Sequence, residues 1–144
     1  MQTASRTQRH RIPWIAASIL AILLIAPVLA LLRLVPWFDW RILFGVPLVV
    51  SIFAFFAYRS DKRRAEAGDW RIPETTLHLT ALLGGWPGAF LAQRTFRHKV
   101  SKVSFQLTFW AVVLLHEFIA IDSLQHWRIS TNVYRVIDAQ MGGR

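Results

Sequence analysis

Residues 75–93, TTLHLTALLGGWPGAFLAQ, decide the fold because the length of this stretch and its interior indicate different structures. The stretch has 19 consecutive residues without a formal charge, enough for a helix that crosses a bilayer. At its centre, Gly84 and Gly85 favour a helix stop, whereas Pro87, followed by Gly88, favours a helix start. The run therefore divides into two helices of about ten residues, each about 15 Å long, or roughly half of a 30 Å hydrocarbon core.

This stretch admits two arrangements in a membrane. A helical hairpin that enters and leaves on one side places the charged residues before and after it at the same interface. A fourth spanning helix is the alternative, because Gly and Pro are common in ordinary membrane helices. The hairpin puts 12 of the 17 Lys and Arg on the inner side and the full crossing puts 11 there, so both place the N-terminus inside. We expect the re-entrant hairpin, because the full crossing strands the bases of segment 94–102 outside without an acid.

Three longer apolar segments flank this stretch, at 12–32, 42–58 and 103–121. The first has 21 residues without a charge and follows a polar segment that carries Arg6, Arg9 and Arg11. A signal peptide has a similar order of segments, but this apolar run is too long and no small-residue cleavage site ends it. We therefore expect a retained helix, with Pro13 in its first turn and a bend at Pro27.

The second apolar segment follows a short loop with Trp37 and Trp40, whose rings suit the aromatic belt at a membrane interface. Its helix is expected to continue beyond the membrane, because nothing breaks it before Gly68. Glycine is the residue that most often ends a helix, so we expect the helix to finish at residue 67.

The sequence thus predicts an all-α protein: a small polytopic membrane helix bundle with three spanning helices and a broken or re-entrant helical hairpin. Four spanning helices are the alternative. The spanning helices are expected near 12–34, 42–67 and 103–121, and the hairpin near 74–96. Residues 1–11 form a basic cytoplasmic N-terminus, 12–121 the membrane domain, and 122–144 a polar tail in which 130–137 is a short helix or disordered.

The composition supports this class. Hydrophobic residues make up 54% of the 144 residues, and the chain has seven Trp and ten Phe. The net charge of +9 comes from bases that gather between the apolar runs, which is typical of cytoplasmic loops next to anionic lipid. Nucleic-acid binding is not expected, because no recognition fold accompanies this charge.

Polar residues that could carry chemistry gather at both ends of the hairpin. They are Asp61, Lys62, Arg71, Glu74, His78, Arg97, His98, Lys99 and Lys102. In one interpretation the two acids pair with Arg97 or Lys99 and lock the hairpin against the second helix. In another, the bases clamp a phosphate-bearing headgroup, with free N–H groups from the helix that starts near Pro73. In a third, Glu74 and His78 share a helix face as an acid-base pair, although no nucleophile completes it.

No metal site or cofactor is expected. The five histidines lack the HExxH pattern or a comparable spacing, and without Cys there are no thiolate ligands or disulfides. His116 and Glu117 lie within about two turns of the end of the last apolar helix. We expect their side chains to reach water, and facing inward they would instead mark a proton path.

The segments around the hairpin also carry a dense set of motifs. They are Tyr58-x-x-Asp61-Lys62-x-x-Ala65-x-x-Gly68-x-Trp70-Arg71-Ile72-Pro73-Glu74-x-x-Leu77-His78, Gly84-Gly85-Trp86-Pro87-Gly88-Ala89, Arg97-His98-Lys99 and Lys102-x-x-Phe105. Over roughly residues 42–120 the chain resembles the bacterial membrane family catalogued as domain of unknown function twelve ninety-four. The resemblance implies a small bacterial membrane protein and no particular activity. Some members carry a cold-shock domain ahead of the membrane part, which is not expected here because the first apolar run begins at residue 12.

We therefore expect a multi-pass protein of the bacterial inner (plasma) membrane with a cytoplasmic N-terminus. The function expected is binding or scaffolding, in which the basic interfacial face contacts anionic lipid headgroups or a protein partner. An interfacial lipid-modifying enzyme and a subunit of an oligomeric small-solute transporter are the alternatives. Membrane lipids are the expected partners, and a homo-oligomer is left open.

Overall fold

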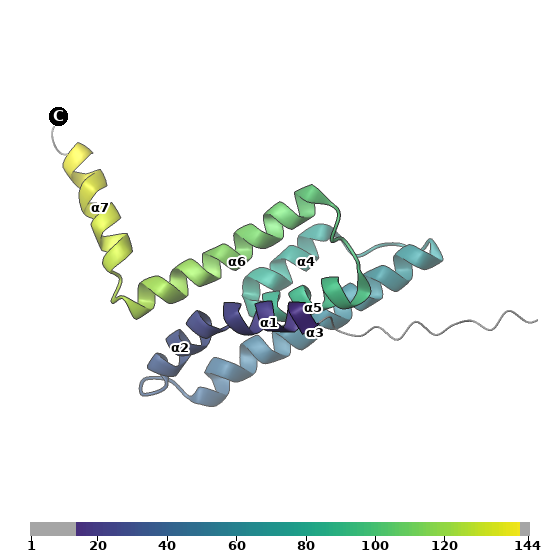
Figure 1. Ribbon diagram of the computed structural model, residues 1–144, viewed down its shortest axis with the longest axis horizontal. Coiled ribbons are helices and arrows are strands. Elements are labelled where there is room, and N and C mark those ends of the chain that lie inside the picture. Colours follow the sequence, from purple (N-terminus) through teal and green to yellow (C-terminus); the bar gives the residue numbers. More distant parts are fainter. Residues whose placement is uncertain (1–13, 142–144) are drawn as a thin grey trace, which may run out of the picture.

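The computed structural model describes residues 14–141, which form helices and the segments that connect them (Figure 1). The basic segment predicted at 1–11 and the predicted helix start at residue 12 lie outside the described residues. The helices are α1 (Trp14–Leu23), α2 (Ile25–Leu34), α3 (Trp40–Ala67), α4 (Glu74–Thr80), the π-helical turn η1 (Ala81–Gly85), α5 (Trp86–Phe96), α6 (Val103–Leu124) and α7 (Arg128–Met141).

Three helical segments are long and apolar enough to cross a membrane. They are Trp14–Leu34, which joins α1 and α2, Trp40–Ala67, which is α3, and Val103–Leu124, which is α6. Between α3 and α6 the chain forms a helical hairpin of α4 and α5 that is broken at η1. The predicted fold class, an all-α bundle with three helices of spanning length and a broken hairpin, is confirmed.

The first spanning segment is bent where α1 meets α2 at Leu24 (Figure 1). Pro27 lies in the first turn of α2 and has no N–H to donate to the carbonyl one turn before it. The bend therefore falls just before the proline, within a turn of the place predicted from the sequence.

α3 runs the length of the bundle, and both of its ends have caps. Asp39 accepts a hydrogen bond from the backbone N–H of Arg41 at 2.8 Å, which satisfies a free donor at the start of α3. Gly68 adopts the left-handed conformation at φ 73° and ends the helix, as predicted. The charged residues of the last turn of α3, Arg64 and Glu66, are exposed.

The hairpin turns at Gly84, whose φ of 98° is accessible mainly to glycine. Pro87 lies in the first turn of α5, so the predicted helix stop and helix start both occur. The hairpin packs mainly against α3, and a Cβ atom on Gly88 would lie only 1.8 Å from the carbonyl oxygen of Ser51. The absence of side chains at the turn thus allows the hairpin tip to touch the backbone of α3.

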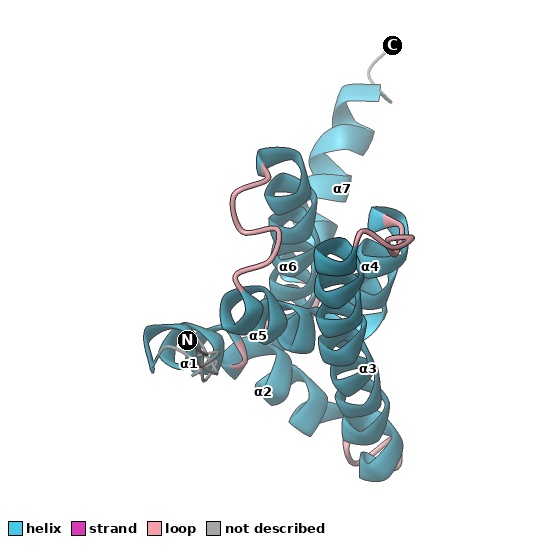
Figure 2. Ribbon diagram, turned by 90° about the vertical axis from the view of Figure 1, so that its right-hand side faces the viewer, coloured by secondary structure: helices cyan, strands magenta, loops and turns pink. Residues whose placement is uncertain are grey.

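The buried core lies between the hairpin, α3 and α6. Its largest buried apolar side chains include Tyr58 from α3, Leu77 and Phe90 from the hairpin, and Phe105 and Phe109 from α6. Large apolar residues also cover the outside of the three spanning segments, as expected for helices that face lipid. Figure 2 shows the bundle end-on, with α7 extending away from the packed helices. The predicted short helix at 130–137 is part of this longer α7.

Candidate functional site

The carboxylate of Asp61 is the centre of the polar cluster at the end of α3. Its side chain is fully buried and accepts a hydrogen bond from the backbone N–H of Ile72 at 3.0 Å. Its second oxygen lies 2.8 Å from the ring Nε2 of His98 and 3.0 Å from the Nζ of Lys99. One buried carboxylate therefore ties α3 to the segment that enters the hairpin and to the segment that leaves it.

Lys99 and Lys102 connect the same cluster to Glu74, the first residue of α4. The Nζ of Lys99 lies 3.4 Å from Glu74, and Lys102 donates to both carboxylate oxygens of Glu74, at 2.8 and 2.9 Å. The hydrogen bond from Lys102 and the charge of Lys99 hold the pKa of Glu74 below its usual range, against a smaller effect of burial. Both ends of the hairpin thus meet at one end of the bundle.

A tight turn after α5 directs the side chains of His98 and Lys99 toward Asp61. Arg97 and Lys99 have φ angles of 48° and 59°, a left-handed conformation that is uncommon for residues other than glycine. The backbone N–H of His98 donates to the carbonyl of Gln93 at 3.1 Å and closes the end of the helix. The exposed Arg97 makes no ion pair among the described residues, so Lys99, and not Arg97, supplies the predicted pairing with the two acids.

Lys62 and Arg71 differ in their surroundings. The Nζ of Lys62 donates to the carbonyl of Phe96 at 2.7 Å, which caps the C-terminal end of α5, and lies 3.6 Å from Glu66. Arg71 is exposed in the segment before α4 and has no ion-pair partner in the described chain. The structure therefore joins five of the nine predicted residues, Asp61, Glu74, His98, Lys99 and Lys102, in one network of contacts and leaves the Arg71 and Arg97 guanidinium groups on the outside.

His78 lies one turn after Glu74 on α4 but packs as a ring. Its centroid lies 4.3 Å from the centroid of Phe105, and its Nδ1 is buried without a hydrogen-bond partner among residues 14–141. Burial lowers the pKa of His78, which favours the neutral form of the ring. Because Glu74 is held by two lysines and its pKa is lowered, it is a weak general base. The pair offers little support for acid-base catalysis.

A series of hydrogen bonds between Tyr58, Gln93 and Gln106, next to the Asp61 cluster, was not predicted from the sequence. The Nε2 of Gln93 donates to the hydroxyl of Tyr58 at 3.4 Å, and Gln106 donates to the Oε1 of Gln93 at 2.6 Å and to the carbonyl of Lys99 at 3.0 Å. The signal was available in the sequence, because Gln93 ends the uncharged stretch 75–93 and Gln106 interrupts the apolar segment 103–121. Their buried contacts add a second link between α3, α5 and α6.

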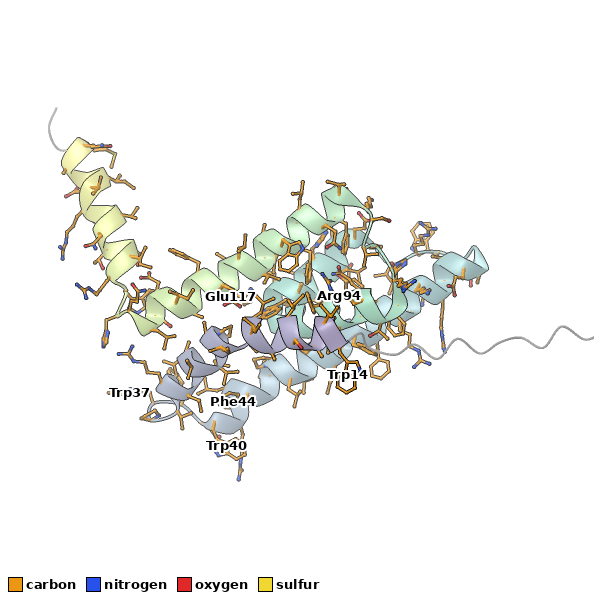
Figure 3. All side chains as sticks on the ribbon, in the orientation of Figure 1. Trp14, Trp37, Trp40, Phe44, Arg94 and Glu117 are labelled. Carbon is orange, nitrogen blue, oxygen red and sulfur yellow. The ribbon has the colours of Figure 1, made fainter. Side chains whose placement is uncertain are left out.

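Arg94 and Glu117 lie at different positions along the bundle (Figure 3). The guanidinium carbon of Arg94 lies 3.9 Å from the ring centroid of Phe90, a cation–π contact. Glu117 is half-buried, and one of its carboxylate oxygens is buried without a hydrogen-bond partner in the described part of the chain. The neighbouring His116 donates through Nδ1 to the carbonyl of Val112 at 2.8 Å.

Among residues 14–141, no group of three or more His, Asp or Glu side chains is placed to hold a metal ion.

Comparison with known proteins finds one matching family and one similar protein. Residues 51–105 match the family model described as "Protein of unknown function (DUF1294)", a shorter segment than the 42–120 of the resemblance seen in the motifs. The chain is similar to the uncharacterized protein YsdA of Bacillus subtilis (strain 168), with 37% identity over 59 residues. This match covers 41% of the present chain and 66% of YsdA.

No solved structure matches the chain significantly. The matched segment 51–105 begins inside α3, contains the whole hairpin and ends in the first turn of α6. It therefore includes both acids of the cluster and the three bases that surround them. Through these residues the chain matches the DUF1294 family of proteins of unknown function, the family that its motifs resemble.

Proposed function

We propose that this protein is an integral membrane binding protein whose arginine-rich face recruits anionic lipid headgroups. In this proposal the hairpin is re-entrant: it enters and leaves the membrane at the cytoplasmic side, where the N-terminus also lies. The observation that carries the proposal is the set of exposed guanidinium groups around the Asp61 cluster. They belong to Arg63, Arg64, Arg71 and Arg97, and none makes an ion pair among the described residues.

The charges at this end are strongly unbalanced. Segment 59–102 contains nine Lys and Arg against four Asp and Glu. Asp61 and Glu74 are already engaged by Lys99 and Lys102, so they do not neutralise the exposed arginines. A surface of this kind attracts anionic lipid by about 1 kcal/mol for each Lys or Arg near the bilayer.

The orientation follows from the same imbalance. With three spanning segments and a re-entrant hairpin, 12 of the 17 Lys and Arg lie on the side of the Asp61 cluster. Short loops rich in Lys and Arg stay in the cytoplasm. The arginine-rich face then meets the cytoplasmic leaflet, whose anionic lipids give it a negative surface potential.

Two features of the exposed arginines suit lipid headgroups: their position along the bundle and the geometry of the guanidinium group. The arginines extend from the ends of α3 and α5 and from the segment before α4, where the apolar part of the bundle ends. A guanidinium group can donate two parallel hydrogen bonds to one phosphate, which a lysine cannot do in the same geometry. The face therefore favours phosphate groups held at the membrane surface.

Binding is tested with the full chain in nanodiscs of phosphatidylcholine that contain a minor fraction of phosphatidylglycerol. Native mass spectrometry then measures how much phosphatidylglycerol is retained on the released protein. We expect a quadruple variant, with Arg63, Arg64, Arg71 and Arg97 each changed to Gln, to retain less phosphatidylglycerol. The amount retained should fall at least about tenfold, because each charge contributes about 1 kcal/mol.

The matched control changes Arg41 and Arg135, two exposed arginines outside this segment, to Gln. This control should retain phosphatidylglycerol like the unmodified protein. A control that loses about half as much binding free energy as the quadruple variant would show that only total charge matters, because it removes half as many charges. Either this result or an unchanged quadruple variant would overturn the proposal. Raising the salt concentration should also weaken phosphatidylglycerol binding, because salt screens exposed charges.

A further inference from the structure

A large apolar cavity lies at the opposite end of the bundle from the Asp61 cluster. It has a volume of about 980 Å³ and opens between α2, the first half of α3, the hairpin tip and the last turns of α6. Its walls include Val28, Leu48, Ile52, Trp86, Leu91 and Ile119. This volume is at the upper end of the range of about 300–1,000 Å³ that is common for small-molecule sites.

The cavity exists because the hairpin fills only part of the bundle. The turn at Gly84 lies against Pro47, and beyond this point α3 continues toward Trp40 without a hairpin beside it. The walls along α3 extend from Phe44 to Phe55, or roughly 16 Å at 1.5 Å per residue. This is about the hydrocarbon thickness of one leaflet, half of a core of about 30 Å. The cavity therefore has the length of a lipid chain in a single leaflet.

A positive charge lies where the cavity reaches the end of the bundle. The guanidinium group of Arg33 donates to the carbonyls of Ser123 and Leu124, at 3.1 and 2.9 Å, and to the ring nitrogen of His126. A guanidinium group has five N–H donors, so these three contacts leave two without an acceptor in residues 14–141. No carboxylate of the described chain lies within ion-pair distance of Arg33.

Other groups at this end complete an amphipathic site. Trp37 and Phe44, labelled in Figure 3, line the cavity together with Arg33, His126 and Trp127. Tryptophan rings are common at the depth where lipid headgroups meet the hydrocarbon core. The site thus passes from aromatic and basic groups at one end to largely apolar walls at the hairpin tip, where Ser51 is a polar exception.

We infer that this cavity holds a hydrocarbon chain of an anionic lipid, with the negatively charged headgroup beside Arg33. The spanning helices keep lipid next to the cavity, and an apolar cavity of this size has few polar groups that would stabilise water. The charge complementarity at Arg33 selects an anionic lipid over a zwitterionic one. This site is separate from the arginine-rich face of the proposed function, because it lies at the other end of the bundle.

The probe for this site is phosphatidylglycerol with a photoreactive diazirine near the end of one acyl chain, at a few per cent in phosphatidylcholine nanodiscs that contain the full chain. After illumination, peptide mass spectrometry locates the labelled residues. We expect label on residues of the cavity wall, such as Leu48 and Ile119, in excess of label on Leu107 and Leu114, which face outward elsewhere on α6. A phosphatidylcholine probe with the same chain should label the wall about two- to fivefold less, as expected for one exposed ion pair.

Two substitutions on α2 separate occupancy from general packing. Val28 lines the cavity and is 37% exposed, whereas its neighbour Leu29 is 49% exposed and is not part of the cavity wall. Val28→Trp should fill the space and remove most of the wall label, and Leu29→Trp should leave it unchanged. In Arg33→Gln, the phosphatidylglycerol and phosphatidylcholine probes should both label the cavity wall, and to the same extent.

Several outcomes would overturn the inference. Label spread evenly over wall and outward-facing residues would show lipid that only surrounds the protein. If the cavity wall is still labelled in Val28→Trp, the acyl chain does not occupy the cavity. If the phosphatidylglycerol and phosphatidylcholine probes label the unmodified protein equally, Arg33 does not select the headgroup. A cross-link between two copies through Val28→Cys, in place of lipid label, would show a second protein chain in the cavity. Because the four arginines of the opposite face are intact in these variants, failure here leaves the proposed function standing.

Discussion

The Nζ of Lys99 lies 3.0 Å from the buried carboxylate of Asp61, so a residue that follows the hairpin pairs with one that precedes it. The same ammonium group lies 5.0 Å from the ring centroid of Phe105, and its side chain is only 10% exposed. Two charged groups are therefore removed from water together. Such a pair is costly to break, because removing one partner leaves the other buried without compensation.

Asp61→Asn is expected to destabilise the protein by about 3 kcal/mol, the lower end of the range for breaking a buried pair. The lower end applies because Glu74 still lies 3.4 Å from Lys99. The midpoint of thermal unfolding in detergent measures the change. Combining Asp61→Asn with Lys99→Met should recover part of the loss, since the unpaired ammonium group is then removed.

The control for this pair is Glu66→Gln. Glu66 is an exposed partner of Lys62 at 3.6 Å, and its loss should change stability by less than about 1 kcal/mol. An effect of Asp61→Asn no larger than that of Glu66→Gln would contradict the assignment of Asp61 as the residue that holds the hairpin to α3.

Acid is expected to remove the contribution of Glu74 to stability. The hydrogen bond from Lys102 lowers the pKa of Glu74 in the folded protein below its ordinary value of 4.5. The unfolded chain therefore binds the proton first, and the stabilisation is complete above about pH 4.5 and is lost as the pH falls through the folded pKa. The difference in unfolding midpoint between the unmodified protein and Glu74→Gln should be constant near neutral pH and should narrow below about pH 4.5. A difference that widens in acid would show the opposite sign of the shift.

Much of the fold could be predicted from the sequence, because it depends on local signals. Uncharged length identifies the spanning segments, and the observed segments Trp14–Leu34, Trp40–Ala67 and Val103–Leu124 differ from the predicted ones by at most three residues where both are described. The broken hairpin follows from Gly84 and Pro87, which act on the backbone wherever they occur. These features do not depend on how the helices are rotated.

The contacts between helices could not be predicted in the same way. The choice of Lys99 over Arg97 as the partner of the acids depends on a left-handed turn that no glycine signals. The cavity and the capping of α6 by Arg33 depend on the rotation and spacing of helices that are distant in sequence. Hydrophobic length shows that a segment can span the membrane, but it does not show which face a neighbour covers.

Gly88→Ala is expected to push α5 away from α3. Its Cβ would lie 1.8 Å from the carbonyl oxygen of Ser51, and backbone atoms cannot move aside as a flexible side chain can. The cost should reach or exceed about 3 kcal/mol, the upper end for overpacking, and the purified protein should lose its single peak in size-exclusion chromatography. Gly45→Ala is the matched control, because nothing lies within 4 Å of a Cβ there. Similar behaviour of both variants would contradict the close approach of the hairpin to α3.

Asp122→Ala is expected to loosen α7 without affecting the hairpin. The buried carboxylate of Asp122 accepts hydrogen bonds from the backbone N–H of Ile129 at 2.9 Å and of Ser130 at 3.3 Å, the free donors at the start of α7. Loss of such a cap costs about 0.5–2 kcal/mol. Hydrogen exchange should therefore become faster in α7, whereas the exposed Asp138→Ala should leave the first turn of α7 unchanged. Equal exchange in both variants would remove the capping role of Asp122.

The most direct test of the re-entrant hairpin is side-specific labelling of single cysteines in a chain that has none. Ser101→Cys follows the hairpin, Ala67→Cys precedes it, and Gln125→Cys lies beyond α6, all at exposed positions. An impermeant thiol reagent applied to right-side-out and inverted vesicles should label residues 67 and 101 from the cytoplasmic side only and residue 125 from the outside only. Labelling of residues 67 and 101 from opposite sides would establish four crossings, split the Asp61 cluster across the membrane and contradict the account.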